Sequence, residues 1–87
     1  MTDIVQWNVN GVRSRYTELQ QLIYHENPAI LCLQETHLRP ENSLSISGYY
    51  VHRYDHLAGI RANGGCALLL RQSVFSLSSI LPLLING

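Results

Sequence analysis

The sequence has 87 residues, of which 14% are charged and 46% are hydrophobic, and its six arginines balance its six acidic side chains. Ordinary soluble domains carry roughly 25% charged residues, so this chain is rich in core-forming residues and poor in charged surface. Zero net charge excludes a strong overall attraction to nucleic acid or to an anionic membrane, and the length limits the chain to one small domain.

The cysteines and the apolar runs indicate the compartment. Cys32 and Cys66 lie within apolar runs and lack the spacing of a zinc site or a disulfide framework. No apolar run approaches the roughly 18 residues of a membrane helix, and no basic stretch followed by an apolar block opens the sequence. We therefore expect an intracellular protein, nuclear or cytoplasmic, that is not secreted and has no membrane partner.

The first predicted elements are a strand and a helix. Residues 3–8 are rich in β-forming side chains and are followed by the turn signal Asn10-Gly11. A helix comes next, which we expect Ser14 to cap and Asn27-Pro28 to stop. Because a short helix gains most of its stability from packing, this one needs a surface to pack against. Its apolar face consists of Tyr16, Leu19, Leu22 and Ile23.

The next predicted element is a strand at residues 29–34, an apolar run that ends at Glu35. Consecutive apolar residues without alternation predict a strand buried on both faces, of the kind found inside a parallel sheet. Joined to the first strand through the helix, it forms a right-handed βαβ unit with parallel strands. Glu35 alone could simply be the first solvated residue after a strand, but Asn8 then emerges at the same edge, where open α/β sheets bind ligands. An amide beside a carboxylate suits Mg²⁺ and a phosphate oxygen.

The second half of the sequence predicts a loop and two strands. Residues 38–47 are mostly polar and contain Pro40 and Asn42, so they predict a loop or a frayed helix at the edge of the site. Residues 48–54 and 65–71 predict the strands, which we expect to pair antiparallel across the connection at residues 55–64. One face of the first strand carries aromatic rings that form either an ordinary half-buried face or a surface for stacking bases. These rings belong to Tyr50, His52 and Tyr54.

Several polar residues in this half have more than one interpretation. Arg53 and Arg61 either contact phosphate or are simply solvated. Asp55-His56 is interpreted as an ordinary polar turn within the connection. His37 has no partner at metal-binding spacing, so we do not expect it to be a metal ligand.

Two motifs and the helix between them resemble a known family. Residues 7–13 (WNVNGVR) and 27–38 (NPAILCLQETHL) are similar to the start of the endonuclease/exonuclease/phosphatase domain. The histidine of the second motif and residues 64–70 (GGCALLL) resemble the branch of LINE-type, jockey-like non-LTR retrotransposons more than the related apurinic/apyrimidinic endonucleases. The resemblance covers residues 4 to about 70, and residues 73–87 diverge. It implies an α/β fold in which residues 1–87 form the amino-terminal part of a four-layered α/β sandwich, a βαβ unit followed by an antiparallel strand pair.

The resemblance also implies a Mg²⁺-dependent endonuclease that hydrolyses phosphodiester bonds and nicks target DNA. Glu35 matches the metal ligand of the family and is catalytic. Asn8 matches the catalytic asparagine that holds the phosphate or the water network, and Asn10 matches a position that contacts the phosphate or supports these two side chains. The family's Asp-x-Asn segment is absent from the sequence, and Asp55-His56 comes too early to be its final Asp-His pair. We therefore expect no independent catalysis.

The predicted strand at residues 29–34 leads to the same expectation. It needs cover on both faces, and the chain offers one helix and a small apolar tail at residues 80–85. We therefore expect the amino-terminal portion of a larger domain, whose partners are DNA and the missing carboxyl-terminal half, normally followed by a reverse transcriptase. Two alternatives stay open: a non-catalytic remnant or nucleic-acid-binding module, and a piece of a sugar-phosphate or lipid phosphatase of the same superfamily.

Overall fold

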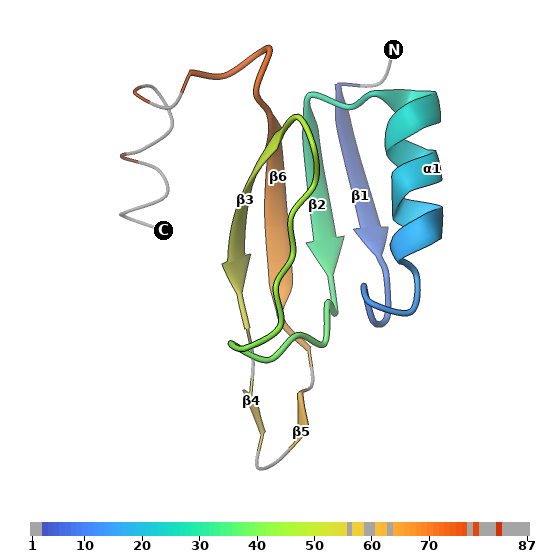
Figure 1. Ribbon diagram of the computed structural model, residues 1–87, viewed down its shortest axis with the longest axis vertical. Helices are drawn as coiled ribbons and strands as arrows, with labels where there is room; N and C mark the ends of the chain where they lie inside the picture. The colour runs from blue at the N-terminus through green and yellow to red at the C-terminus, as the bar shows by residue number, and fades with distance from the viewer. Residues whose placement is uncertain are drawn as a thin grey trace.

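The structure is a computed structural model that describes residues 3–55, 57–58, 61–62, 64–76, 78 and 82. Strands β1, β2, β6 and β3 form one sheet in that order, and the β4–β5 hairpin forms a second, two-stranded sheet (Figure 1). The expected α/β fold is therefore confirmed. The elements in chain order are β1 (Ile4–Asn8), α1 (Tyr16–Glu26), β2 (Ile30–Gln34), β3 (Tyr49–Tyr54), β4 (Leu57–Ala58), β5 (Arg61–Ala62) and β6 (Cys66–Arg71).

Strands β1 and β2 form the expected βαβ unit with α1 between them. The two strands are parallel, with Ile4 opposite Ile30 and Asn8 opposite Gln34. Val9 extends the pairing by donating its backbone N–H to the carbonyl oxygen of Gln34 at 2.9 Å. Both strands consequently end at the same edge of the sheet, as Figure 1 shows.

Strands β3 and β6 pair antiparallel, as expected from the sequence. β6 lies between β3 and β2 and is antiparallel to β2 as well. The sheet is therefore mixed, with one parallel and two antiparallel pairings. Its order brings the start of β6 next to the end of β2.

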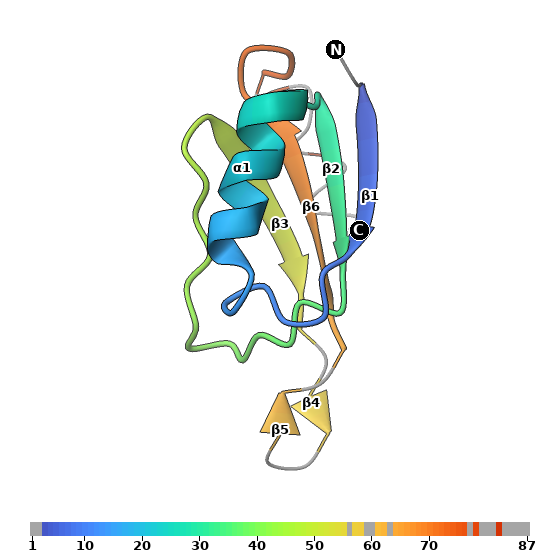
Figure 2. The same cartoon turned by 90° about the vertical axis from the view of Figure 1, so that its right-hand side faces the viewer.

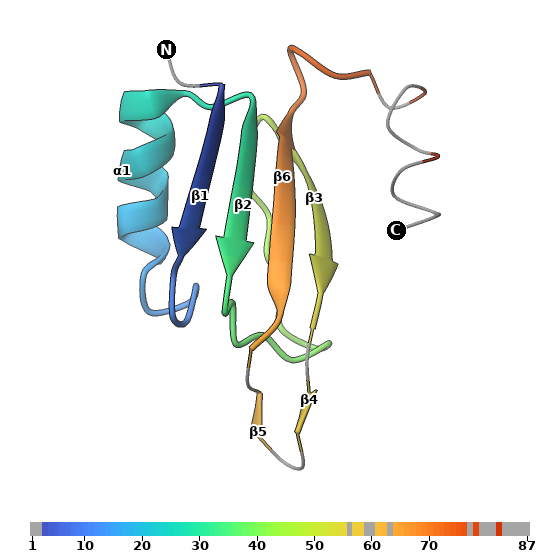
Figure 3. The ribbon, with the colours of Figure 1, turned by 180° about the vertical axis from the view of Figure 1, so that it is seen from behind.

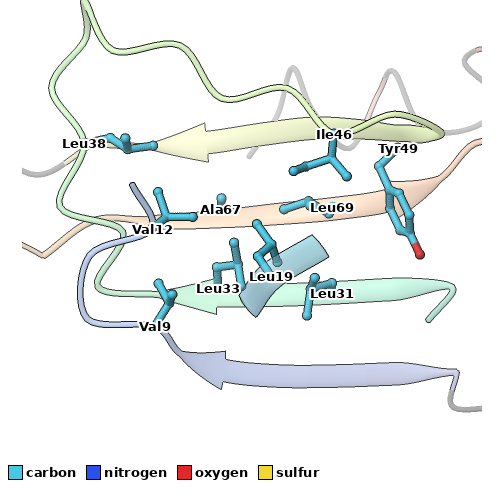
Figure 4. Packing of buried hydrophobic residues seen from close by; sticks show 10 residues of the cluster. All are labelled: Val9, Val12, Leu19, Leu31, Leu33, Leu38, Ile46, Tyr49, Ala67 and Leu69. Atoms are coloured by element: carbon cyan, nitrogen blue, oxygen red, sulfur yellow. The ribbon is translucent and has the colours of Figure 1, made fainter. Parts of the chain in front are cut away.

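The core lies on one face of the sheet. α1 and the connection between β2 and β3 are on the same side of it (Figure 2). Leu19 is the buried residue of α1 and lies among side chains of β2 and β6 (Figure 4). The core cluster consists of Val9, Val12, Leu19, Leu31, Leu33, Leu38, Ile46, Tyr49, Ala67 and Leu69.

The other face of the sheet is uncovered by the described residues, and Figure 3 shows it from that side. Leu31 and Leu33 of β2 are fully buried, whereas Ile30 and Cys32 are only half-buried. Within the described part of the chain, α1 and the β2–β3 connection cover one face of this strand (Figure 2), and the cover that the sequence predicts for its other face does not come from these residues. The tail at residues 80–85 lies outside the described residues, apart from residue 82.

The ends of α1 differ in how well the sequence predicts them. Ser14 donates its hydroxyl to the carbonyl oxygen of Gly11 at 3.1 Å, and Arg15 is the N-cap residue. The prediction that Ser14 caps the helix is wrong, because its hydroxyl is bound within the preceding turn. Asn27 ends the helix as expected, with a φ of 45° and its backbone N–H donated to Ile23. Within the described ranges, no helix has the length and hydrophobicity needed to cross a membrane.

Candidate functional site

Asn8 and Glu35 lie together at the ends of β1 and β2. Asn8 is the last residue of β1, and Glu35 directly follows β2. The Nδ2 of Asn8 donates to the Oε2 of Glu35 at 2.5 Å. The side chain of Glu35 is 48% exposed, so the carboxylate remains accessible from solvent. The juxtaposition expected from a parallel strand pair is thus present, while the catalytic roles of both residues stay predictions.

Backbone hydrogen bonds join the loops that follow β1 and β2. The N–H of Gly11 donates to the carbonyl oxygen of Glu35 at 2.8 Å, and the N–H of Val12 donates to that of Thr36 at 3.0 Å. Thr36 is fully buried. The backbone that carries Glu35 is therefore fixed to the loop that follows Asn8.

Two glycines before β6 hold the same segment from the opposite side. The N–H of Thr36 donates to Gly65 at 3.3 Å, and the N–H of His37 donates to Gly64 at 2.8 Å. Both glycines have positive φ, 70° and 82°, a conformation that glycine adopts without steric penalty. The glycine pair therefore lets the start of β6 approach the segment that carries Glu35.

Left-handed backbone conformations gather at this edge of the sheet. Glu35, His37 and Asn10 have φ values of 55°, 54° and 50°. The left-handed region costs roughly 1–2 kcal/mol for a residue with a Cβ, and asparagine tolerates it better than most. Strained conformations persist where the surroundings over-determine them, and they cluster at functional sites. The hydrogen bonds on both sides of residues 35–37 provide that constraint.

His37 lies beside Glu35, a contact that was not expected from the sequence. Its Nε2 lies 3.7 Å from the Oε1 of Glu35, and its side chain is 28% exposed. The Glu35 carboxylate therefore has two polar neighbours, Asn8 at one oxygen and His37 at the other. No signal in the sequence indicates this contact, because it depends on the left-handed backbone conformations of Glu35 and His37.

Asn10 lies outside the hydrogen-bonded pair of Asn8 and Glu35. It is exposed in the turn that follows β1. Its supporting or phosphate-contacting role stays a prediction.

An open cleft of about 590 Å³ lies over this edge of the sheet. Each of the four strands of the main sheet contributes a terminal residue or its neighbour to the lining. The cleft therefore lies across the ends of all four strands. The lining residues are Asn8, Gln34, Glu35, Tyr54, Asp55, Gly64, Gly65 and Cys66.

Residues 5–84 match the endonuclease/exonuclease/phosphatase family. The chain belongs to this family. The resemblance on which the sequence-based expectations rest is therefore confirmed.

Individual proteins show similarity over most of the chain. The probable RNA-directed DNA polymerase from transposon X-element of Drosophila melanogaster is 27% identical over 71 residues, which are 82% of this chain and 8% of that protein. A 3′ phosphatase from Neisseria, bound to a product DNA hairpin, has a TM-score of 0.67 at 27% identity over 82% of this chain and 28% of its own. An AP endonuclease from Archaeoglobus fulgidus has a TM-score of 0.59 at 27% identity over 80% of this chain and 27% of its own. The chain thus spans less than a third of each of these proteins.

The cleft of this family member offers one accessible carboxylate among its described residues. Asp55 also lines the cleft, but both of its oxygens accept hydrogen bonds from Arg53. No group of three or more His, Cys, Asp or Glu side chains able to hold a metal ion occurs within the described ranges. Mg²⁺ is commonly bound through one or two carboxylates, with several waters retained. The exposed Glu35 carboxylate beside the Asn8 amide fits one side of such a site, and the remaining ligands would be water, phosphate or further residues.

Arg53 is neither solvated nor directed at the cleft as a phosphate ligand. Its side chain is 21% exposed. The guanidinium donates to Asp55 and to two backbone carbonyls of the β2–β3 connection. Both interpretations from the sequence are therefore wrong for Arg53, because internal acceptors occupy its donors. The side chains of Arg61 and His56 lie outside the described residues.

Tyr50, His52 and Tyr54 of β3 share the open face of the sheet, as the alternation predicted. The rings of His52 and Tyr54 are 5.3 Å apart and nearly perpendicular, at 87°. Tyr49, in contrast, is buried on the covered face with the core cluster. Stacking of a nucleic-acid base on the open-face rings stays a prediction.

Proposed function

We propose that this chain carries the Asn8–Glu35 part of the active site of a Mg²⁺-dependent DNA endonuclease of the LINE type, which hydrolyses a phosphodiester and nicks target DNA. The observation that carries the proposal is the hydrogen bond between Asn8 and Glu35 at the cleft. Similarity to a transposon-encoded polymerase and to a phosphatase bound to DNA supports the retroelement setting and the substrate.

Each of the three candidate residues has a distinct role in this proposal. Glu35 offers a half-exposed carboxylate as the Mg²⁺ ligand, and bound Mg²⁺ would neutralise phosphate charge and lower the pKa of a water molecule. Asn8 orients that carboxylate through its Nδ2, and its amide retains a second N–H and a carbonyl oxygen for phosphate or water. Asn10 contacts the phosphate or supports the pair from the adjacent turn.

We propose that the 87-residue chain by itself binds Mg²⁺ but does not hydrolyse a phosphodiester bond. Hydrolysis requires a nucleophile that is held in line with the phosphorus. In the described part of the cleft, the Asp55 carboxylate is engaged by Arg53 and so does not serve as the group that orients it. We propose that the rest of the catalytic domain covers the open face of the sheet and supplies these groups, and that a reverse transcriptase belongs to the same protein.

Nicking of supercoiled plasmid DNA tests the proposal. The assay uses the longest protein translated from the reading frame that contains this chain, with Mg²⁺ or with a chelator. We expect nicking only with Mg²⁺, and we expect Glu35→Gln to lower the rate by about 100-fold or more. Glu18→Gln is the matched control, because Glu18 is an exposed carboxylate on α1. A nicking rate that Glu35→Gln leaves unchanged contradicts the metal-ligand role.

The same preparation separates the alternative functions. Release of phosphate from a soluble phosphomonoester, without plasmid nicking, would favour a phosphatase. Salt-dependent DNA binding without any hydrolysis would favour a binding module, because such binding rests on phosphate contacts and counterion release. Loss of nicking in Glu35→Gln together with retained DNA binding supports the endonuclease.

A further inference from the structure

Arg53 and Asp55 form a partly buried ion pair at the end of β3. The Nε of Arg53 donates to the Oδ1 of Asp55 at 3.0 Å, and its Nη2 donates to the Oδ2 at 2.7 Å. The two side chains are 21% and 13% exposed. Two parallel N–H···O bonds fix the plane of the guanidinium as well as its charge. The pair is therefore a rigid unit at the margin of the cleft that Asp55 lines.

The same guanidinium holds the turn at residues 39–42. Arg53 Nη1 donates to the carbonyl oxygen of Asn42 at 2.5 Å, and Nη2 donates to that of Arg39 at 2.7 Å. The turn is also closed internally, since Asn42 N–H donates to Arg39 O and Arg39 N–H donates to Asn42 Oδ1, each at 3.0 Å. Arg53 thus connects the end of β3 to a preformed turn within the β2–β3 connection.

This turn is the far end of the segment that carries Glu35. Residues 35–37 are held by the loop after β1 and by the glycines before β6. Leu38 follows and is fully buried within the core cluster, where Figure 4 shows its side chain. The turn at residues 39–42 comes next, so the segment is anchored at both ends although Glu35 and His37 are left-handed.

We propose that Arg53 and Asp55 are a positioning pair for the Glu35 site. The pair locks the turn at residues 39–42, and the turn keeps the Glu35 carboxylate at the edge where Asn8 meets it. The metal-binding consequence rests on the proposed function, whereas the locking of residues 36–42 does not. Surface ion pairs contribute little, but this pair is partly buried and bidentate, and its guanidinium also binds two carbonyls. Lysine cannot reproduce that fork of donors.

The test is made with the 87-residue chain and a double variant, Arg53→Met with Asp55→Leu. Replacing both partners leaves no unpaired buried charge, so the chain is expected to fold. The matched control is Arg15→Met with Glu18→Leu, which removes an exposed ion pair of 3.3 Å at the start of α1. Amide hydrogen exchange reports the local stability of residues 36–42 and of α1, and titration with MgCl₂, followed by NMR, reports the metal affinity.

In the double variant we expect amides of residues 36–42 to exchange about tenfold faster while those of α1 keep their rates. We expect Mg²⁺ to bind about tenfold more weakly, the lower end of the loss that follows when the residues that orient a metal ligand are removed. The control should change neither quantity. Arg53→Lys should resemble the double variant, because it keeps the charge and loses the fork.

Three outcomes decide against parts of this inference. Unchanged exchange at residues 36–42 and unchanged Mg²⁺ affinity in the double variant overturn the positioning role. Equal acceleration of all amides, α1 included, also overturns it, since the pair would then act only through global stability. Faster exchange confined to residues 36–42, in a chain whose unaltered form binds no Mg²⁺, supports the locking of the turn and overturns the proposed metal role of Glu35.

Discussion

Glu35 combines an accessible carboxylate with an unfavourable backbone conformation. Its φ is 55°, and its carbonyl oxygen accepts a hydrogen bond from Gly11 at 2.8 Å. An L-residue in this region costs roughly 1–2 kcal/mol relative to a right-handed conformation, whereas glycine adopts it freely. A side chain that is present despite this cost is consistent with a functional role for the carboxylate.

Two substitutions at Glu35 separate the backbone cost from the side chain. Glu35→Ala and Glu35→Gly both remove the carboxylate and its bond to Asn8, but only glycine relieves the left-handed strain. We expect the glycine variant to have a free energy of unfolding about 1 kcal/mol higher than the alanine variant in urea denaturation. Glu41 is the control, because it is 66% exposed and is absent from the described residues with positive φ. At Glu41 we expect the alanine variant to be more stable than the glycine variant. If the alanine variant is the more stable one at Glu35 as well, the proposed backbone strain at Glu35 is contradicted.

Single residues of the site were predictable from the sequence to different degrees. The meeting of Asn8 and Glu35 followed from one parallel strand pair, since both residues end strands of the same βαβ unit. The contact of His37 with Glu35 and the role of Arg53 did not follow, because they depend on left-handed residues and on the path of the loop at residues 38–47. Side-chain spacing does not encode that path.

At the scale of elements, Tyr49 connects β3 to the residue that leads into β2. Its hydroxyl donates to the carbonyl oxygen of Pro28 at 2.6 Å, and its ring is buried in the core. Burial raises the pKa of the Tyr49 hydroxyl above its ordinary value of 10.0, and the charge of Arg71 partly opposes this effect. The raised pKa means that the fold favours the protonated phenol.

Replacing Tyr49 by phenylalanine should lower the free energy of unfolding by about 1 kcal/mol at neutral pH, because one buried hydrogen bond is lost. A pKa raised in the folded state gives a contribution that is complete below the unfolded value of 10.0 and is lost as the pH rises through the folded value. The difference between the native chain and Tyr49→Phe should therefore shrink above pH 10 in urea denaturation. Tyr24→Phe is the control, since Tyr24 is 84% exposed. A difference that stays constant to strongly alkaline pH would contradict this interpretation.

The order of the elements was only partly predictable. Residues 48–54 and 65–71 were expected to pair, and they do, but a pairwise prediction does not say which strand of the two also meets β2. The run at residues 66–70 is almost entirely apolar, with Ala67, Leu69 and Leu70 buried. Such runs are typical of central strands, so the sequence did contain the signal that β6 is the inner strand.

At the scale of the whole molecule, one face of the main sheet is left open by the described residues (Figure 3). Ile4 is 64% exposed on that face, and a hollow of about 330 Å³ lies over β2, β6 and β3. Sheets in mixed α/β proteins are ordinarily packed on both faces. The chain spans less than a third of the related structures, which agrees with the proposal that further parts of the catalytic domain cover this face and complete the site.

The magnesium site formed by Asn8 and Glu35 is tested most directly by titrating the ¹⁵N-labelled 87-residue chain with MgCl₂. The signals to follow are the side-chain amide of Asn8 and the backbone amides of residues 35–37. We predict saturable shifts confined to the residues that line the cleft, lost in Glu35→Gln and retained in the exposed helix control Glu18→Gln. Shifts that do not saturate, or that persist unchanged in Glu35→Gln, would contradict a metal site at this edge of the sheet.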